Sequence, residues 1–203
     1  MTLHIHHVER AKIKALRPTQ LTVGYREVTA KRTEWDGMSK RARQRFLDGH
    51  VVPTVLGPKQ RSYVVDHHHL ARALADEGHD TILIGQLADL SALEPTEFWN
   101  IMDHRRWVYP YDAAGARQPF AAIPKAITAL ADDPWRSLAG AVRSAGGYAK
   151  ENEPFAEFLW ADFFRRRIDP ALLASNFGTA MATALALAHR PAAAHLPGWT
   201  ARA

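Results

Sequence analysis

Two patterns of hydrophobic positions divide the chain. In the first half, residues 51–56 and 61–65 are apolar, β-branched runs on either side of Gly57-Pro58-Lys59-Gln60. Such runs around a glycine–proline turn predict a β-hairpin. Residues 81–87 predict another strand, and a helix is expected from about residue 39 to residue 48.

The second half has helical spacing. A helix is expected to start at Glu94-Pro95, and Asp133-Pro134 is a good N-cap and first-turn pair for a helix that reaches about Ala145. Residues 155–163 carry an apolar stripe of helical period. Asp169-Pro170 opens an alanine-rich final helix that Pro191 ends. Strands followed by helices indicate an α+β protein.

Composition narrows the classes of protein. The 203 residues, 47% of them hydrophobic, are enough for one good core or for a modest core with a helical extension. The absence of cysteine excludes disulfides, thiolate metal sites and thiol nucleophiles. The first residues do not resemble a signal peptide, and no segment approaches about 20 uninterrupted apolar residues. A cytoplasmic protein with no membrane partner is therefore expected.

The net charge of +5 is concentrated in the first half, where residues 1–90 hold 14 Lys or Arg against 10 Asp or Glu. The densest basic cluster is Lys40, Arg41, Arg43 and Arg45. This cluster is suited to a nucleic-acid backbone or to guiding a nucleotide triphosphate, and it is equally typical of a solvated helix face.

The strongest candidate for chemistry is Asp66-His67-His68-His69, which lies where a short strand is expected to become a helix. The free amides of a helix start favour an anion. Asp66 is suited to holding Mg²⁺ or accepting a proton, and histidines bind metal when neutral and phosphate when protonated. Alternatively, Asp66 only caps the helix. Three consecutive histidines cannot all lie on one apolar helix face. Gly78 is expected to end this helix.

Another histidine group stands near the N-terminus. Its members, at spacings that fit no specific ligand template, are His4, His6 and His7. They form either a second metal cluster or a polar terminus.

Several segments of the first half form a recognisable order: Leu-Arg-Pro-Thr-Gln-Leu at residues 16–21, Gly-Tyr-Arg-Glu-Val at residues 24–28, and residues 50–58 and 65–69. In these segments the chain resembles the ParB-like nuclease family of the ParB/sulfiredoxin superfamily. Residues 132–140 and 155–162 also look like segments of that family, so the resemblance runs from about residue 16 to residue 168. It implies a ParB/sulfiredoxin-like N-terminal domain with a small mixed sheet at residues 1–90, followed by a mainly helical C-terminal domain at residues 91–203.

The resemblance leaves the chemistry open. Superfamily members related to partition proteins bind DNA and bind or hydrolyse CTP, sulfiredoxins use ATP to phosphorylate a sulfinate, and some relatives are free serine kinases. All of them place nucleotide phosphates near the counterpart of the Asp66-His69 junction. Sulfiredoxin carries a catalytic cysteine there, so sulfinate repair by that mechanism is excluded for this chain. Neither a helix-turn-helix region nor a dimerisation tail is identifiable, so a role in chromosome partition is not expected.

The preferred hypothesis is a nucleotide-dependent phosphotransferase or nucleotide hydrolase that acts on a small-molecule acceptor. The cofactors would be Mg²⁺, held by Asp66, and ATP, ADP or CTP. Glu27 is the candidate base, because related free serine kinases use a glutamate from a neighbouring segment, and Glu34 is its competitor. His68 belongs to the candidate catalytic set with Asp66 and would contact phosphate. The other candidate phosphate contacts are Arg26, His67, His69, Arg72 and Arg136.

Alternatives remain at several points. Arg136 is also suited to a salt bridge with Asp132, Asp133 or Glu157, and the two aspartates are suited to metal or to capping. The runner-up function is a metal-dependent nuclease or DNA-binding protein whose helix at residues 40–45 follows the backbone. Against it, there is no clear second carboxylate cluster and no evident aromatic platform for single strands. A nucleotide-binding switch is a third possibility, and the oligomeric state stays open.

Overall fold

A computed structural model describes residues 5–201 of the chain, which divide into two compact units. The first unit runs to Asp132 and holds the β-sheet, and the second runs from Asp133 onward and is helical. A small mixed sheet with helices, followed by a helical part, confirms the expected α+β class.

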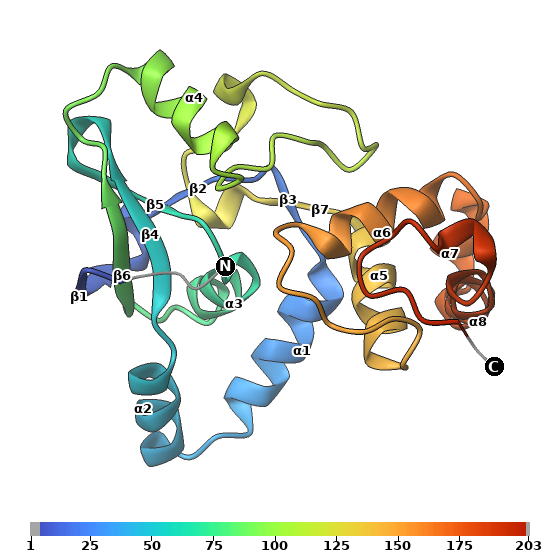
Figure 1. The fold of residues 1–203 in the computed structure, drawn as a ribbon. Coiled ribbons are helices and arrows are strands. Elements are labelled where there is room, and N and C mark those ends of the chain that lie inside the picture. The colour runs from blue at the N-terminus through green and yellow to red at the C-terminus, as the bar shows by residue number, and fades with distance from the viewer. Residues whose placement is uncertain (1–4, 202–203) are drawn as a thin grey trace. The chain divides into compact units, whose positions relative to one another are not determined.

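The sheet unit combines short strands with four α-helices (Figure 1). Its strands are β1 (His7–Lys12), β2 (Arg17–Pro18), β3 (Thr22–Val23), β4 (Val52–Gly57), β5 (Arg61–Val64), β6 (Thr81–Asp89) and β7 (Ala131–Asp132). Its helices are α1 (Tyr25–Asp36), α2 (Lys40–Gly49), α3 (His68–Asp76) and α4 (Pro95–His104). The five-stranded sheet has the order β1-β6-β4-β5-β2, and β3 pairs separately with β7.

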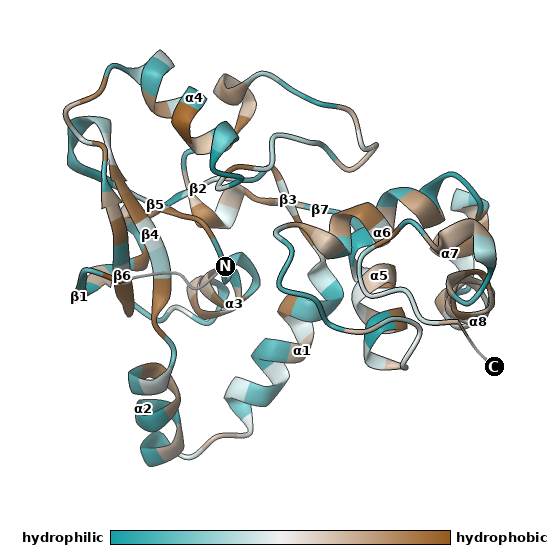
Figure 2. Ribbon diagram, in the orientation of Figure 1, coloured by the Kyte–Doolittle hydropathy of each residue, from teal (hydrophilic) through white to brown (hydrophobic). Residues whose placement is uncertain are grey.

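The predicted hairpin is confirmed, because β4 and β5 pair antiparallel around a turn at Pro58–Gln60. Lys59 and Gln60 both have positive φ angles, of 61° and 54°, which lets the chain reverse there. β6 joins β4 in parallel, as the partner of a central strand that is buried along most of its length. Figure 2 accordingly colours much of β4 and β6 brown, whereas α1 and α2 are largely teal or pale.

Helix α3 follows β5 and covers the sheet with an apolar face. Leu70, Ala71 and Leu74 on this face are buried in one core with Val23 and Ile82. The predicted stop is confirmed: Gly78 has a φ of 68°, and the N–H of His79 donates to the carbonyl of Leu74.

Helix α1 was not identified from the sequence, and its start explains why. Its N-cap residue, Gly24, has no side chain to accept a hydrogen bond. The carboxylate of Asp132 serves instead, because its Oδ1 accepts the N–H of Tyr25 at 2.8 Å. A cap supplied from so far along the chain leaves no local signal.

The segment after residue 90 belongs to the sheet unit. Phe98 of α4 is fully buried, and its ring lies 4.6 Å from that of Tyr63 in β5. Farther along, the N–H of Tyr109 donates to the carbonyl of Thr19 at 2.9 Å. The compact unit therefore extends to Asp132, whereas the sequence placed a domain boundary after residue 90.

The helical unit contains α5 (Pro134–Ser144), α6 (Ala156–Arg165), α7 (Pro170–Ser175) and α8 (Phe177–Ala188). The predicted start at Asp133-Pro134 is confirmed, because Oδ1 of Asp133 accepts the N–H of Trp135. The prediction of one helix from Asp169-Pro170 to Pro191 was wrong. Asn176 separates α7 from α8, and its side-chain oxygen caps α8 by accepting the N–H of Thr179. Asparagine side chains bond to nearby backbone groups in this way, which favours a helix end over a helix interior.

Within residues 5–201, no helix combines the length and the apolar character needed to cross a membrane.

Candidate functional site

The β5–α3 junction places Asp66 and His67 at the surface. Their side chains are 69% and 41% exposed, and His67 has a left-handed backbone with a φ of 64°. Oδ1 of Asp66 accepts the N–H of His67 at 2.6 Å, so Asp66 closes the turn and does not cap α3. Because α3 begins without a side-chain cap, its first amides retain the affinity for an anion that helix starts have.

His68 lies beneath this surface and is only 3% exposed. Its Nε2 accepts the backbone N–H of Thr19 at 3.2 Å. Burial lowers the pKa of His68 to about 4; the nearby Asp66 opposes this shift, and His67 adds to it. The ring is therefore neutral at pH 7, and it holds the chain segment that precedes β3.

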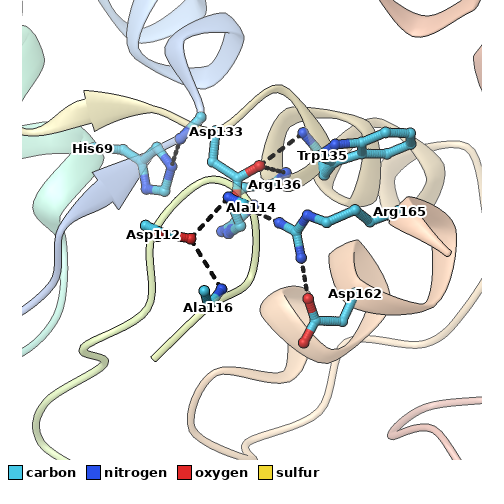
Figure 3. Close-up of polar contacts among 10 residues, drawn as sticks. His69, Asp112, Ala114, Ala116, Asp133, Trp135, Arg136, Asp162 and Arg165 are labelled. Carbon is cyan, nitrogen blue, oxygen red and sulfur yellow. Dashed lines mark hydrogen bonds and ion pairs between the residues drawn. The ribbon is translucent and has the colours of Figure 1, made fainter. Parts of the chain in front are cut away.

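His69 makes a parallel contact. Its Nε2 accepts the N–H of Gly24 at 3.0 Å, which Figure 3 shows as the dashed line from the His69 ring. Gly24 is the residue before α1, so the two imidazoles tie the loop from Thr19 to Gly24 to the first turn of α3. The starts of α1 and α3 are thereby brought together.

Arg26 and Glu27 lie in the first turn of α1, directly after the Gly24 that is bonded to His69. Arg26 is exposed and Glu27 is partly exposed. Glu34 lies in the last part of the same helix, about two turns beyond Glu27, so Glu27 is the better placed of the two glutamates.

The guanidinium of Arg72 makes several structural contacts. Its guanidinium pairs with Asp76 at 2.9 Å, donates to the carbonyl of Leu130 at 2.7 Å, and lies over the ring of Tyr25. These contacts hold α3 against the start of α1 and against the chain that leads into β7. The role of Arg72 in binding phosphate stays a prediction.

Arg136 belongs to the helical unit, near the start of α5. The predicted alternative of a salt bridge is confirmed, with Nη2 3.9 Å from Oε2 of Glu157. A contact between Arg136 and phosphate stays a prediction.

Asp132 and Asp133 are both helix caps. Asp132 caps α1, and Asp133 caps α5 by accepting the N–H groups of Trp135 and Arg136 at 2.9 and 3.2 Å. Oδ2 of Asp133 also accepts from Arg165 at 3.0 Å, and Arg165 pairs with Asp162 in turn (Figure 3). Burial raises the pKa of Asp133, and Arg165 and the two amides oppose this rise. These contacts favour capping over metal binding for both aspartates.

No group of three or more His, Asp or Glu side chains between residues 5 and 201 is arranged to hold a metal ion. His6 and His7 are included in that statement, and His4 lies outside the described residues. Mg²⁺ commonly needs only one or two carboxylates when phosphate oxygens complete its shell. The exposed carboxylate of Asp66 fits a site of this kind, in which one carboxylate and phosphate oxygens hold the ion together.

The sequence did not reveal Thr19 and Gly24 as partners of the histidines. Both bonds use backbone N–H groups, and every residue except proline carries one. No residue type could therefore have indicated them.

A small mixed sheet that leads through a strand-to-helix junction into α3 is consistent with a ParB-like domain followed by helices. The chain belongs to the family described as "Putative ParB-like nuclease", whose model matches residues 9–166. It is also similar to the crystal structure of protein Atu1540 from Agrobacterium tumefaciens, with 51% sequence identity and a TM-score of 0.91. The similarity covers 97% of this chain and 98% of that one. The comparison with curated proteins finds no match.

Proposed function

We propose that nucleotide phosphates bind at the start of α3 and that the protein is a nucleotide-dependent phosphotransferase or hydrolase acting on a small molecule. The observation that carries this proposal is the uncapped start of α3 beside the exposed Asp66 and His67. Backbone amides at such a start, together with the helix dipole, form a ready anion site.

The surrounding residues have distinct roles in this proposal. Asp66 would hold Mg²⁺ jointly with the phosphates, and that ion would neutralise charge on the transferred group. His67 is exposed enough to contact phosphate directly. His68 and His69 act as positioning residues, because their acceptor nitrogens hold the loop from Thr19 to Gly24.

Glu27 is the proposed base for an acceptor hydroxyl. It stands in the first turn of α1, and the residue before that helix is bonded to His69 of α3. Arg26, its exposed neighbour, would add positive charge at the same helix start. Phosphoryl transfer depends mainly on positioning and charge neutralisation, so this small set of groups would suffice.

The test is calorimetric titration with ATP, ADP, CTP and a short DNA duplex, each with Mg²⁺ and at two salt concentrations, followed by assays of nucleotide turnover. We expect one nucleotide to bind with weak dependence on salt. Asp66→Ala should keep its fold and lose turnover, whereas Glu151→Gln, at an exposed position of the helical unit, should change neither. Unchanged turnover in Asp66→Ala would remove Asp66 from the mechanism.

DNA binding, with or without cleavage, is the second candidate, and one surface favours it. The exposed side chains of Lys40, Arg41 and Arg45 on α2 make no ion pair or hydrogen bond within the described part of the chain. Unpaired cations on one helix are suited to a phosphate backbone. Duplex binding that falls steeply with salt, and that is lost when all three are changed to Gln, would favour this function over the first.

A further inference from the structure

The five-stranded sheet has two outer strands, β1 at one edge and β2 at the other (Figure 1). β2 has two residues, and one of them, Pro18, has no N–H group, so that edge is short and poor in donors. β1 has six residues, and within residues 5–201 it pairs with β6 alone. Its outer edge is therefore the side on which this sheet accepts another strand.

The backbone groups of alternate β1 residues point out of this edge. In an antiparallel pair, every second residue exchanges hydrogen bonds with the partner strand, and the residues between them point away. The N–H of Ile13 donates to the carbonyl of Asp80 at 2.9 Å, in the register of β1 with β6. Counted back in steps of two from Ile13, the residues that face β6 are Ala11, Glu9 and His7. The residues whose N–H and carbonyl groups face outward are Val8, Arg10 and Lys12.

Two exposed apolar side chains lie on one face of this edge. Val8 is 47% exposed and Ile5 is 42% exposed, the highest values among the large hydrophobic side chains that the structure describes. Val8 stands opposite Gly85 of β6, so its side chain is on the face where a Cβ of Gly85 would be. Cδ1 of Ile5 lies 2.8 Å from that Cβ position, so Ile5 is on the same face. Covering this pair with a partner would remove apolar surface from water.

The charges of β1 favour a second copy of the same strand, in one register. A copy added antiparallel across a two-fold axis must place outward-facing residues opposite one another. With Val8 opposite Val8 of the second copy, His7 of each copy stands opposite Glu9 of the other. Sliding the copies toward the other end of β1 puts Glu9 opposite Glu9 or Arg10 opposite Arg10, and like charges in such positions destabilise a sheet.

The side chains on the second face agree with this register. Within one chain, Nε2 of His7 lies 3.9 Å from Oε2 of Glu9, and both side chains are more than half exposed. In the dimer, each Glu9 carboxylate would have one imidazole beside it and another opposite it. Arg10 already pairs with Asp48 of α2 at 2.8 Å, so its charge is balanced within its own chain.

We propose that the protein forms a dimer by antiparallel pairing of β1 with β1 of a second copy, with Val8 on the two-fold axis. The N–H of each Val8 donates to the carbonyl of the other, and the two sheets become one. The contact closes on itself, because both copies use the same surface. β6 and β4 separate β1 from β5, which leads to the Asp66 junction, so the inference goes beyond the proposed function.

The first measurement is sedimentation of the full-length protein from about 10 μM to about 1 mM. We expect a monomer–dimer equilibrium with a Kd of about 1 mM or tighter, because one pair of strands is a small interface. Glu9→Lys places a lysine opposite His7, and His7→Glu places two carboxylates opposite each other. Each variant should weaken the dimer about tenfold or more and keep the wild-type thermal stability, since both positions are exposed. Glu151→Lys, which reverses an exposed charge in the helical unit, should leave dimerisation unchanged.

Mixing the two variants tests the register. In a mixed dimer, the lysine of Glu9→Lys faces the glutamate of His7→Glu, and the unchanged His7 and Glu9 face each other. An equal mixture should therefore associate at least as tightly as the wild type. Amide exchange gives a second readout: the N–H of Val8 should be protected only at concentrations that form the dimer, whereas that of Glu9, which faces β6, should be protected throughout.

Four results would each overturn the proposal. They are a monomer at about 1 mM, a dimer that both charge variants leave intact, no gain on mixing them, and protection of the Val8 amide that does not change with concentration. An added peptide of unrelated alternating sequence is the probe for a different occupant. If it protects the Val8 amide of the monomer as well as a second copy does, the edge accepts strands in general and the second copy is not its specific partner.

Discussion

The buried backbone N–H of Thr19 donates to Nε2 of His68 over 3.2 Å, across 49 positions of the chain. The three consecutive histidines therefore have different surroundings. His67 is exposed beside Asp66, His68 holds Thr19, and His69 holds Gly24. A stretch that looks like one ligand cluster in sequence is therefore one exposed side chain and two structural acceptors.

The first prediction concerns pH. The pKa of His68 is about 4 in the folded protein, against 6.5 for an ordinary histidine. The unfolded chain therefore binds more protons between these two values, so acid shifts the equilibrium toward unfolding. We expect the free energy of unfolding to fall by about 3 kcal/mol in total as the pH drops from above 6.5 to below 4, and the loss from this group to level off about one unit below the folded pKa.

Urea denaturation across this pH range, on the wild type and on His68→Gln, provides the measurement. A glutamine oxygen still offers an acceptor to Thr19 but does not titrate. The variant should therefore show a shallower loss of stability with acid. Parallel curves for the two proteins would show that His68 does not carry the effect.

Much of the fold was predictable where the signal is local. The starts of α2, α4 and α5 follow from Ser39, Glu94 and Asp133, each of which caps a helix within three residues of itself. Distant partners left no such signal. The start of α1 depends on Asp132, and the burial of His68 depends on Thr19. The sequence thus located the junction but did not show which of its histidines face outward.

The second prediction concerns the adjacent caps. Asp132→Ala should cost about 1 kcal/mol, because the first amide of α1 loses its acceptor. Asp133→Ala should cost more, about 2–3 kcal/mol, since it also removes a partner of the mostly buried Arg165. Asp133→Asn should cost less than Asp133→Ala, because burial raises the pKa of Asp133 and a neutral acceptor suits that site.

Hydrogen exchange separates the two sites. Asp132→Ala should speed exchange in the first turn of α1, whereas Asp133→Ala should speed it in α5 and α6. Loss of protection in the same helix for both variants would contradict the assignment of one cap to each unit.

The third prediction tests the packing of α4 on the hairpin. A Cβ atom at Gly57 would lie 2.6 Å from Cε2 of Phe98 and 2.7 Å from Cε2 of Tyr63. Gly57→Ala should therefore destabilise the protein by about 1–3 kcal/mol through overpacking. Gly49→Ala is the matched control, because a Cβ there meets nothing within 4 Å. Thermal unfolding of both variants is the measurement. If Gly57→Ala were as stable as Gly49→Ala, residues 95–104 would not pack on the sheet as described.

The last prediction concerns magnesium and follows from the proposed function. Because Asp66 is exposed and is the only carboxylate of the Asp66-His69 stretch, Mg²⁺ at the junction would need phosphate oxygens to complete its shell. Wild-type affinity for the preferred nucleotide should fall about tenfold or more when a chelator removes Mg²⁺. Asp66→Asn should bind the nucleotide about equally with and without the ion.

Calorimetry with and without the chelator measures both proteins. His67→Gln is an informative companion variant, because His67 is proposed to contact phosphate and not the metal. It should weaken binding by a similar factor whether or not Mg²⁺ is present, whereas Asp66→Asn should lower affinity only in its presence. If Asp66→Asn retains the full magnesium effect, the ion is held elsewhere, and the chemistry proposed for this junction loses its metal ligand.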